Sequence, residues 1–302
     1  MQGTNMAKLS NDSQINWAGG SLWEMTKQAR VITLIGAGGK TTCLQTLTQE
    51  IHAAGFPVIA TTTTKVYPER HLKPWLHSMP PPFASKTAYF WYSGAEERSG
   101  KWLGHSLSAV DDAVLGDVDG PITHSNDHPG RRHWIIEGDG ARERRLKCWA
   151  GHEPQIPLQS DCGVLVVDGR LWGQELKPED VHRAECCPDL FNNQWTEESA
   201  WRYFRKSPVF YPQYQHLAWV ILLNIHDQPD PIKIKSFEES IFPEMENQAG
   251  LPELKDLVVL LEALYRRGVE EVFSKAPETK PRSLRIAAGD AKGGKLLWFD
   301  LW

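Results

Sequence analysis

Apolar residues along the chain gather in short runs, and segments with helical periodicity lie between several of these runs. Continuous apolar runs predict buried strands at 31–35, 57–60, 163–167 and 219–223. Weaker runs predict further strands at 87–92, 134–136, 285–288 and 296–299. Buried strands that alternate with helices are typical of an α/β protein with a mostly parallel central sheet.

Helices are predicted where apolar residues recur every three or four positions. Leu44, Leu47 and Ile51 define a helix from Lys40 to Ala54, and Gly55 is its expected C-cap. A capping-box pattern at 21–24 predicts a short helix that ends near Arg30. The other expected helices cover 106–115, the region of 181–183, 196–205, a segment beyond Pro231, and 254–264. The proline-rich stretch 66–85 is predicted to be a loop.

The strand at 31–35 runs directly into a glycine-rich segment, and a helix follows. This order is the layout of a phosphate-binding loop. The glycines lack a Cβ, so the backbone can bring several N–H groups close to an anion, while the lysine adds positive charge and the first threonine offers a hydroxyl to Mg²⁺. The candidate nucleotide-binding residues of this loop are Gly36, Gly38, Gly39, Lys40, Thr41 and Thr42.

The loop has the short GxxGKT form of the motif. A full Walker A sequence, GxxxxGK[ST], has a glycine where this chain has Leu34. The short form is also seen in nucleotide-dependent ligases. An ordinary turn between a strand and a helix explains the glycines, but it leaves Lys40 and the two threonines after it unexplained.

The strand at 57–60 leads into a run of four threonines and a lysine. Because open α/β sheets bind ligands at the carboxyl ends of their strands, Thr63, Thr64 and Lys65 are candidate contacts to phosphate or Mg²⁺. The alternative is that threonine simply favours strands.

The strand at 134–136 ends in two acidic residues, which is the construction of a Walker B site. Asp139 is the candidate Mg²⁺ ligand, and Glu137 the candidate that orients a water. A solvated turn is the alternative. A basic cluster follows and can supply charge to a transition state, and Lys147 is its favoured catalytic candidate. The cluster consists of Arg142, Arg144, Arg145 and Lys147.

The strand at 219–223 ends in Asn224-Ile-His-Asp227, which is similar to an NKxD base-recognition loop. In such a loop the Asn braces the phosphate-binding loop and the Asp accepts guanine protons. Ile225 stands where the lysine of the motif usually stacks under the base, so the choice between GTP and ATP stays open. A plain turn at the end of a strand is the alternative.

Composition excludes several classes of protein. The net charge of -5 and pI of about 6.1 argue against a nucleic-acid surface. No apolar run approaches the ~18 residues of a membrane helix, and the N-terminus lacks a signal-peptide core, so we expect a cytoplasmic protein without a membrane partner. Five cysteines without CxxC spacing predict neither a disulfide framework nor a zinc site. The adjacent Cys186 and Cys187 fit either a metal or chalcogen role or, more commonly, buried packing.

Several motifs, in this order along the chain, resemble the YqeC family, whose members are described as selenium-dependent hydroxylase accessory proteins. They are GAGGKTT at 36–42, TTTTK at 61–65, ExDGAR at 137–142 with Lys147, HEPQIP at 152–157, Asp161 before a strand, VHR at 181–183 and NxxD at 224–227. The resemblance covers roughly residues 30–230. It departs from the family at Gly138, at Ile225 and after residue 230.

The resemblance implies a P-loop NTPase-like three-layer sandwich. It divides the chain into an N-terminal extension at 1–30, a P-loop NTPase-like domain at 31–230, and a helical and strand completion of that domain at 231–302. It also implies one site, to which the further candidate Arg183 of the VHR motif is added. The residues so implied are Lys40, Thr41, Thr64, Lys65, Glu137, Asp139, Lys147, His152 and His182.

Three functional hypotheses follow. The first is a Mg²⁺-dependent nucleoside triphosphatase that serves a selenium-dependent molybdenum hydroxylase or its cofactor-maturation proteins. The second is an enzyme that transfers a phosphoryl group, or joins substrates as a ligase does, on a small acceptor. The third is a module that senses nucleotide without hydrolysing it.

Overall fold

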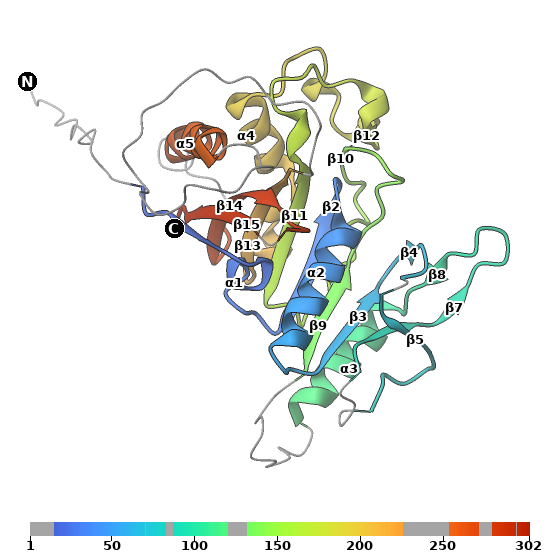
Figure 1. The fold of residues 1–302 in the computed structure, drawn as a ribbon. Helices are drawn as coiled ribbons and strands as arrows, with labels where there is room; N and C mark the ends of the chain where they lie inside the picture. Colours follow the sequence, from blue (N-terminus) through green and yellow to red (C-terminus); the bar gives the residue numbers. More distant parts are fainter. Residues whose placement is uncertain are drawn as a thin grey trace, which may run out of the picture.

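A ten-stranded sheet forms the centre of the molecule (Figure 1). The computed structural model describes residues 15–69, 71–82, 87–119, 132–225, 254–271, 280–293 and 295–302. In spatial order the strands are β1 (Ala18–Gly20), β15 (Lys295–Asp300), β14 (Ser283–Asp290), β13 (Ala218–Asn224), β11 (Cys162–Asp168), β2 (Val31–Gly36), β9 (His133–Glu137), β3 (Val58–Thr62), β6 (Tyr89–Tyr92) and β5 (Lys73–Leu76). Neighbours from β14 to β5 pair in parallel, whereas β15 pairs antiparallel with β14 and with β1. The predicted α/β class and mostly parallel sheet are confirmed.

Helices cover both faces of this sheet. Helices α1 (Leu22–Met25) and α2 (Lys40–Ala53) pack on one face, where Leu44 and Leu47 meet Ile32 and Leu34. Helices α3 (Leu107–Asp119), α4 (Glu197–Lys206) and α5 (Leu254–Val269) pack on the other face. The result is three layers, helix on sheet on helix.

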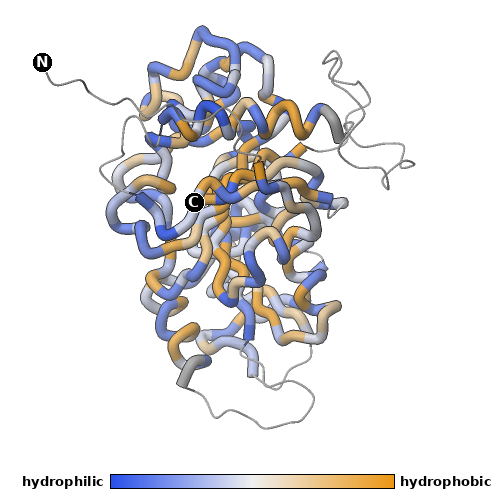
Figure 2. Tube along the Cα trace, turned by 90° about the vertical axis from the view of Figure 1, so that its left-hand side faces the viewer, coloured by the Kyte–Doolittle hydropathy of each residue, from blue (hydrophilic) through white to orange (hydrophobic). Residues whose placement is uncertain are grey.

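The central strands read as unbroken apolar runs because both of their faces are covered. Every residue of β2, β9 and β11 is buried. Figure 2 shows the same pattern, with the hydrophobic colour concentrated in the interior of the trace. These runs are what made the strands predictable from sequence.

Two smaller sheets flank the central one. One pairs β10 (Leu146–Lys147) in parallel with β12 (Val181–His182), and the other has the order β4 (Lys65–Val66), β8 (Trp102–Leu103), β7 (Gly94–Ala95). The helix predicted around 181–183 was wrong. Val181 pairs with Leu146, and Arg183 takes a left-handed φ of 60° that ends the strand. Short 3₁₀ helices cover Gly169–Leu171, Pro178–Asp180, Ala184–Cys186, Pro188–Leu190, Pro208–Phe210 and Pro212–Tyr214.

The predicted loop at 66–85 was also wrong in part, because β5 lies within it. Strand β5 is at the edge of the central sheet, where Pro74 can replace a residue whose N–H would otherwise point away from the sheet. The helix expected just beyond Pro231 lies outside the described residues. Among the described helices, none combines the length and apolarity needed to cross a membrane.

Candidate functional site

The glycine loop joins β2 to α2 at the carboxyl edge of the parallel sheet. Gly36, Gly38 and Gly39 all have left-handed φ values, of 95°, 86° and 117°. A Cβ on Gly38 would lie 2.4 Å from the backbone nitrogen of Asp168, so the loop lies directly against the end of β11. Only glycine combines this backbone conformation with so close an approach.

The N-terminus of α2 opens from this loop. Gly39 is its N-cap, and no side chain caps the helix there. The first amide groups of an α-helix have no acceptor within the helix, so those of Lys40, Thr41 and Thr42 are directed out of its end with a partial positive charge. Thr41 is exposed and Thr42 half-buried. This end of the helix is suited to an anion.

Lys40 and Asp139 form a buried ion pair beside the loop. The Lys40 ammonium is 3.2 Å from an Asp139 oxygen and also donates to the Gly36 carbonyl, and the two side chains are 6% and 1% exposed. Asp139 accepts two further hydrogen bonds, from the Gly36 amide at 3.1 Å and from the Trp149 indole at 2.8 Å. The acid predicted to hold Mg²⁺ therefore contacts the predicted phosphate-binding lysine directly.

Glu137, at the end of β9, is buried near the same pair. Burial, together with the Asp139 and Glu69 carboxylates, raises its pKa to about 7, against the lowering effect of Lys40. Glu69 is itself 4% exposed and accepts a 2.7 Å hydrogen bond from Gln45 of α2. Sequence reasoning missed Glu69, because it lies in the stretch predicted to be a loop and no periodicity marks it.

The threonine run begins at the end of β3 and lies beside the end of β9, where Thr62 pairs with Glu137. Thr62 and the amide of Thr63 donate to the Glu137 carbonyl at 3.0 and 3.1 Å, and Thr64 bonds Thr62. Lys65, in contrast, is 56% exposed and pairs with Glu96. The structure thus brings the threonines to the acidic edge and directs Lys65 toward a neighbouring acid.

Asn224 connects the glycine loop to the end of β13 and to the residue that follows β14. Its amide donates to the Gly38 carbonyl at 2.8 Å, and its oxygen accepts from the Ala291 amide at 3.1 Å. The side chain therefore braces the loop from the end of β13. Asp227, the candidate for base recognition, lies outside the described residues.

Lys147 belongs to a second polar cluster, which adjoins the first because Lys147 contacts Gly140, the residue after Asp139. Its side chain is 0% exposed and donates to the Gly140 carbonyl at 2.7 Å and to Glu153 at 2.9 Å. Arg183 also pairs with Glu153. Burial, with Lys147 and Arg183 nearby, lowers the pKa of His182. His152 is exposed on the adjoining turn.

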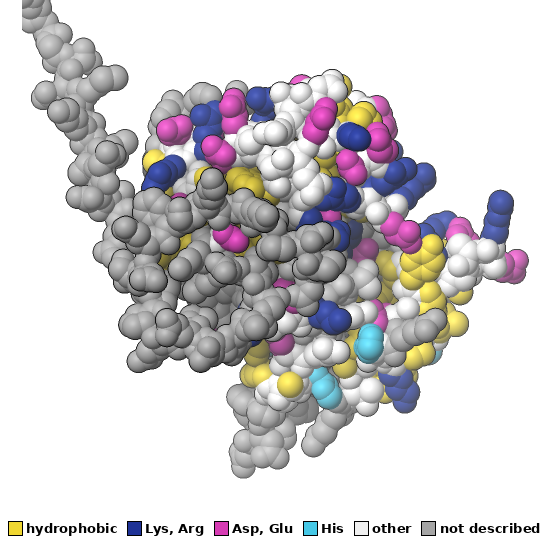
Figure 3. Space-filling view, turned by 45° about the horizontal axis from the view of Figure 1, so that its top comes forward, with side chains coloured by type: hydrophobic (Ala, Val, Ile, Leu, Met, Phe, Trp, Pro, Cys, Tyr) yellow, Lys and Arg dark blue, Asp and Glu magenta, His cyan; other side chains and the backbone are white. Residues whose placement is uncertain are grey.

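Asp168, at the end of β11, holds two arginines beside the loop. It is fully buried, and Arg170 and Arg145 donate to it at 2.7 and 3.2 Å. These guanidinium groups lower the pKa of Asp168 against the effect of burial. Figure 3 shows basic and acidic side chains intermixed over this end of the molecule. The signal available in the sequence was an acidic residue that ends a buried apolar strand, as Glu137 does in β9.

A disulfide joins Cys148 to Cys187, with their Cα atoms 6.2 Å apart. The expectation of no disulfide was therefore wrong. The two residues are separated by 39 positions, and the β10–β12 pairing brings them together, so spacing along the sequence gives no sign of the bond. Cys187 is buried in this bond, whereas Cys186 is an exposed free thiol.

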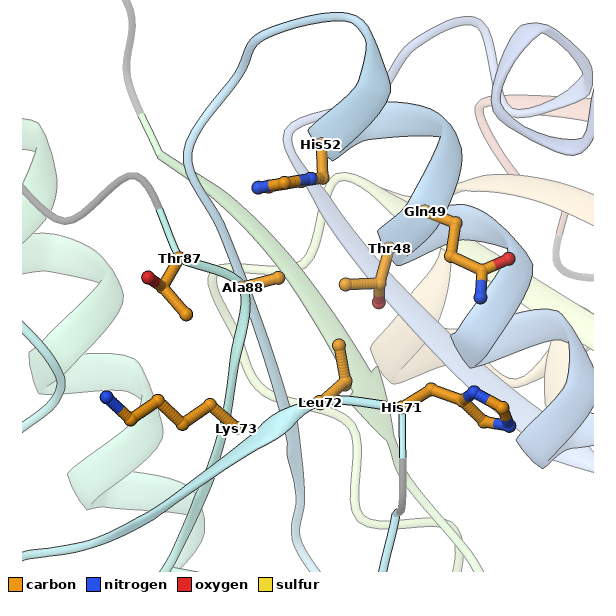
Figure 4. A pocket seen from close by; sticks show the side chains of 8 residues that line it. All are labelled: Thr48, Gln49, His52, His71, Leu72, Lys73, Thr87 and Ala88. Carbon is orange, nitrogen blue, oxygen red and sulfur yellow. The ribbon is translucent and has the colours of Figure 1, made fainter.

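A cavity of about 390 Å³ lies away from the glycine loop, between the C-terminal half of α2 and the start of β5 and β6 (Figure 4). It contains none of the predicted site residues. The side chains of His71 and Lys73 point in opposite directions there, so its basic groups do not converge. In the part of the chain that the structure describes, no three His, Cys, Asp or Glu side chains are grouped to hold a metal ion by themselves.

The fold defines an α/β protein with a large, mostly parallel central sheet and a glycine loop between a central strand and a helix, an architecture compatible with a nucleotide-binding sandwich. The YqeC protein family model matches residues 32–185, and the chain belongs to the YqeC family. It is 33% identical over 162 residues to the uncharacterized protein YqeC of Escherichia coli (strain K12). That match covers 52% of this chain and 59% of the relative. No solved structure matches the chain.

Proposed function

We propose that this protein binds Mg²⁺ with GTP or ATP at the loop 36–42 and hydrolyses the triphosphate. The observation that carries the proposal is the left-handed glycine loop that opens onto the free end of α2, with Lys40 and Asp139 buried beside it. The role as an accessory factor in maturation of a molybdenum hydroxylase rests on the family resemblance alone.

Lys40 must change partners when a triphosphate binds. Its ammonium is held by Asp139 and by the Gly36 carbonyl. Phosphate oxygens are stronger acceptors than a carbonyl and carry their own charge, so they replace these contacts. Asp139 is then released from the lysine while the Gly36 and Trp149 donors keep it in place.

The oxygen groups of the site fit Mg²⁺. This ion prefers oxygen ligands and is usually held by one or two carboxylates together with substrate phosphates, so a complete protein cage is not required. Asp139 and the Thr41 hydroxyl would hold it. When bound, Mg²⁺ supplies charge that neutralises the phosphate oxygens. Glu137, with its pKa near 7, has the proton affinity suited to orient and deprotonate a water.

A second candidate is phosphoryl transfer to a small anionic acceptor. The observation in its favour is the pair Arg145 and Arg170, which Asp168 holds against the glycine loop. Guanidinium groups bind carboxylates and phosphates through paired hydrogen bonds. Phosphate release that requires an added acceptor would favour this candidate over hydrolysis.

The test is a thermal-shift panel of ATP, GTP, CTP and their non-hydrolysable analogues, with and without Mg²⁺, followed by a phosphate-release assay. A ligand at 100 times its dissociation constant stabilises the folded state by about 2.7 kcal/mol, so the melting temperature must rise. Lys40→Ala should abolish this rise and the turnover, with an unchanged circular dichroism spectrum. Lys73→Ala, an exposed lysine on β5, is the matched control and should behave as the wild type.

Normal turnover by Lys40→Ala would remove the mechanism. Tight nucleotide binding without any phosphate release, even with an acceptor present, would instead assign the protein to the sensing class.

A further inference from the structure

Three cysteines line one small cavity near the nucleotide site. The cavity measures about 40 Å³ and is lined by Cys148, Cys186 and Cys187 together with Trp149 and Tyr203, among others. The bond between Cys148 and Cys187 is buried, with each residue 4% exposed. Cys186 is exposed, so its thiol can meet a reagent in solution that the buried bond cannot.

A short chain of contacts leads from this bond to the glycine loop. The Cys148 amide donates a hydrogen bond to the His182 carbonyl at 2.9 Å, and Trp149 follows Cys148 directly in the chain. The Trp149 indole donates to Asp139 at 2.8 Å, and Asp139 in turn accepts the Gly36 amide. A change in the position of Cys148 therefore acts on Asp139 through one side chain.

The segment around Cys148 is also held in place by Tyr203 and by the buried ion pair of Lys147 with Glu153. The Tyr203 hydroxyl donates to the Lys147 carbonyl at 2.9 Å, and its ring stacks on Trp149 with centroids 5.8 Å apart. The β10–β12 pair consists of two residues on each strand. Because so short a pair adds few hydrogen bonds, the Cys148 segment and the loop that contains Cys187 depend on two further links, the disulfide and the Glu153 carboxylate, which pairs with both Lys147 and Arg183.

We propose that Cys148, Cys187 and Cys186 form a thiol–disulfide centre whose state is transmitted through Trp149 and Asp139 to the glycine loop. In the oxidised state the bond fixes Trp149 against Asp139. In the reduced state the Cys148 segment becomes less constrained, and the hydrogen bond from the Gly36 amide to Asp139 breaks more often. The site is thus a redox-sensitive modification site beside the nucleotide loop.

The chemistry requires a dithiol reductant. The Cys186 thiolate first attacks the Cys148 sulfur, which forms a Cys148–Cys186 bond and releases Cys187 as a thiolate, with no net change in oxidation state. One thiolate of the reductant then attacks this more exposed bond, and its second thiolate closes a ring. The reductant leaves as a cyclic disulfide, the two electrons reside on two cysteine sulfurs, and those thiolates take up protons.

The chain contains its own unreactive reference thiols. Burial raises the pKa of both Cys43 and Cys162 to about 12, so neither forms much thiolate near neutral pH. In an alkylation experiment on the folded protein these two cysteines should stay unmodified in every redox buffer. A change in labelling at the other three then reports on the proposed centre alone.

The experiment uses the full chain in oxidised glutathione and in dithiothreitol. Peptide mass spectrometry after alkylation should find Cys148–Cys187 bonded in the first buffer and free in the second. Hydrogen exchange of the peptide that covers 31–42 should be faster in the reduced protein, by about threefold or more at Gly36. Five free thiols in oxidised glutathione, a bond that resists dithiothreitol until the protein unfolds, or equal exchange in both states would each overturn the proposal.

Two variants test the roles of individual residues. Trp149→Phe keeps an aromatic ring at this position but removes the indole N–H, so loop exchange should no longer depend on the state of the bond, although the bond itself still forms and breaks. Cys186→Ser should slow reduction at least about tenfold and leave the reduced end state unchanged. A redox response retained by Trp149→Phe, or an unchanged rate in Cys186→Ser, would contradict the assigned role.

Loop exchange is measured without nucleotide, so this inference and the proposed function can fail separately. If exchange follows the redox state and no nucleotide binds in either buffer, the redox centre stands and the proposed function falls. Where nucleotide does bind, its affinity should differ between the two states, a consequence that rests on the proposed function.

Discussion

For the buried pair of Lys40 and Asp139 we predict that removing one partner lowers the free energy of unfolding by a different amount from removing the other. Asp139→Asn removes the acid and leaves the Lys40 ammonium, 6% exposed, with a hydrogen bond to the Gly36 carbonyl and with the Glu137 carboxyl as a nearby acidic group. Lys40→Met leaves the Asp139 carboxylate with hydrogen bonds from the Gly36 amide and the Trp149 indole. The buried lysine charge therefore loses more stabilisation than the aspartate charge when its partner is removed.

The magnitude follows from these contacts. Breaking a buried ion pair by removing one partner costs about 3–5 kcal/mol, and a hydrogen bond to a charged group contributes about 1.5–3 kcal/mol. We expect Asp139→Asn to cost about 4–5 kcal/mol in the free energy of unfolding and Lys40→Met about 2–3 kcal/mol. In the double variant no isolated charge remains, so its cost should be smaller than the sum by about 2 kcal/mol or more.

The assay is urea unfolding followed by circular dichroism, applied to the wild type, both single variants and the double variant. The matched control is the pair Lys65 and Glu96, which is exposed and should show no measurable coupling in the same cycle. Equal costs for the two single variants, or costs that add in the double variant, would refute the reasoning, because the pair would then behave as solvated charges.

Three other predictions concern neighbouring residues. Glu137 keeps its proton in the folded state up to a pKa of about 7, whereas the unfolded chain releases it near 4.5; unfolding measured across pH 4.5–7 should therefore show stability falling as pH rises, by about 3 kcal/mol, and Glu137→Gln should remove this slope. Gly38→Ala forces a side chain into a left-handed conformation against Asp168 and should cost about 2 kcal/mol or more by denaturant titration, while Gly140→Ala, with open space around it, should cost almost nothing. Asn224→Ala leaves the Gly38 carbonyl and the Ala291 amide without this partner and should cost about 1–3 kcal/mol, with faster hydrogen exchange in both segments; unchanged exchange would count against the bracing role.

Local pattern was enough to predict the strand, glycine loop and helix from Val31 to Ala53. Each step there depends on neighbouring residues: the apolar run is buried on both faces, and the helix presents Leu44 and Leu47 to the sheet. The end of β9 was predictable for the same reason. Nucleotide and Mg²⁺ binding at this edge stay predictions.

Long-range contacts account for what the sequence did not reveal. Glu69 bonds Gln45 and raises the pKa of Glu137 electrostatically. It lies shortly before the edge strand β5, and the prolines of the stretch 66–85 hide that strand in the sequence. The Trp149 indole meets Asp139 only after β10 and β12 have paired. The disulfide depends on the same pairing. In each case the decisive partner is distant or has no periodic signature.

The order of strands in the central sheet bears on how the YqeC segment can be handled experimentally. The matched region ends at residue 185, before the chain reaches β13. Strand β13 pairs with every residue of β11, which lies inside the matched region. A chain shortened to that region would expose the hydrogen-bonding edge of a long apolar strand, which invites aggregation. It would also lose the asparagine that reaches the glycine loop from β13. The homologous segment is therefore best regarded as part of a folding unit that needs the later strands to be soluble.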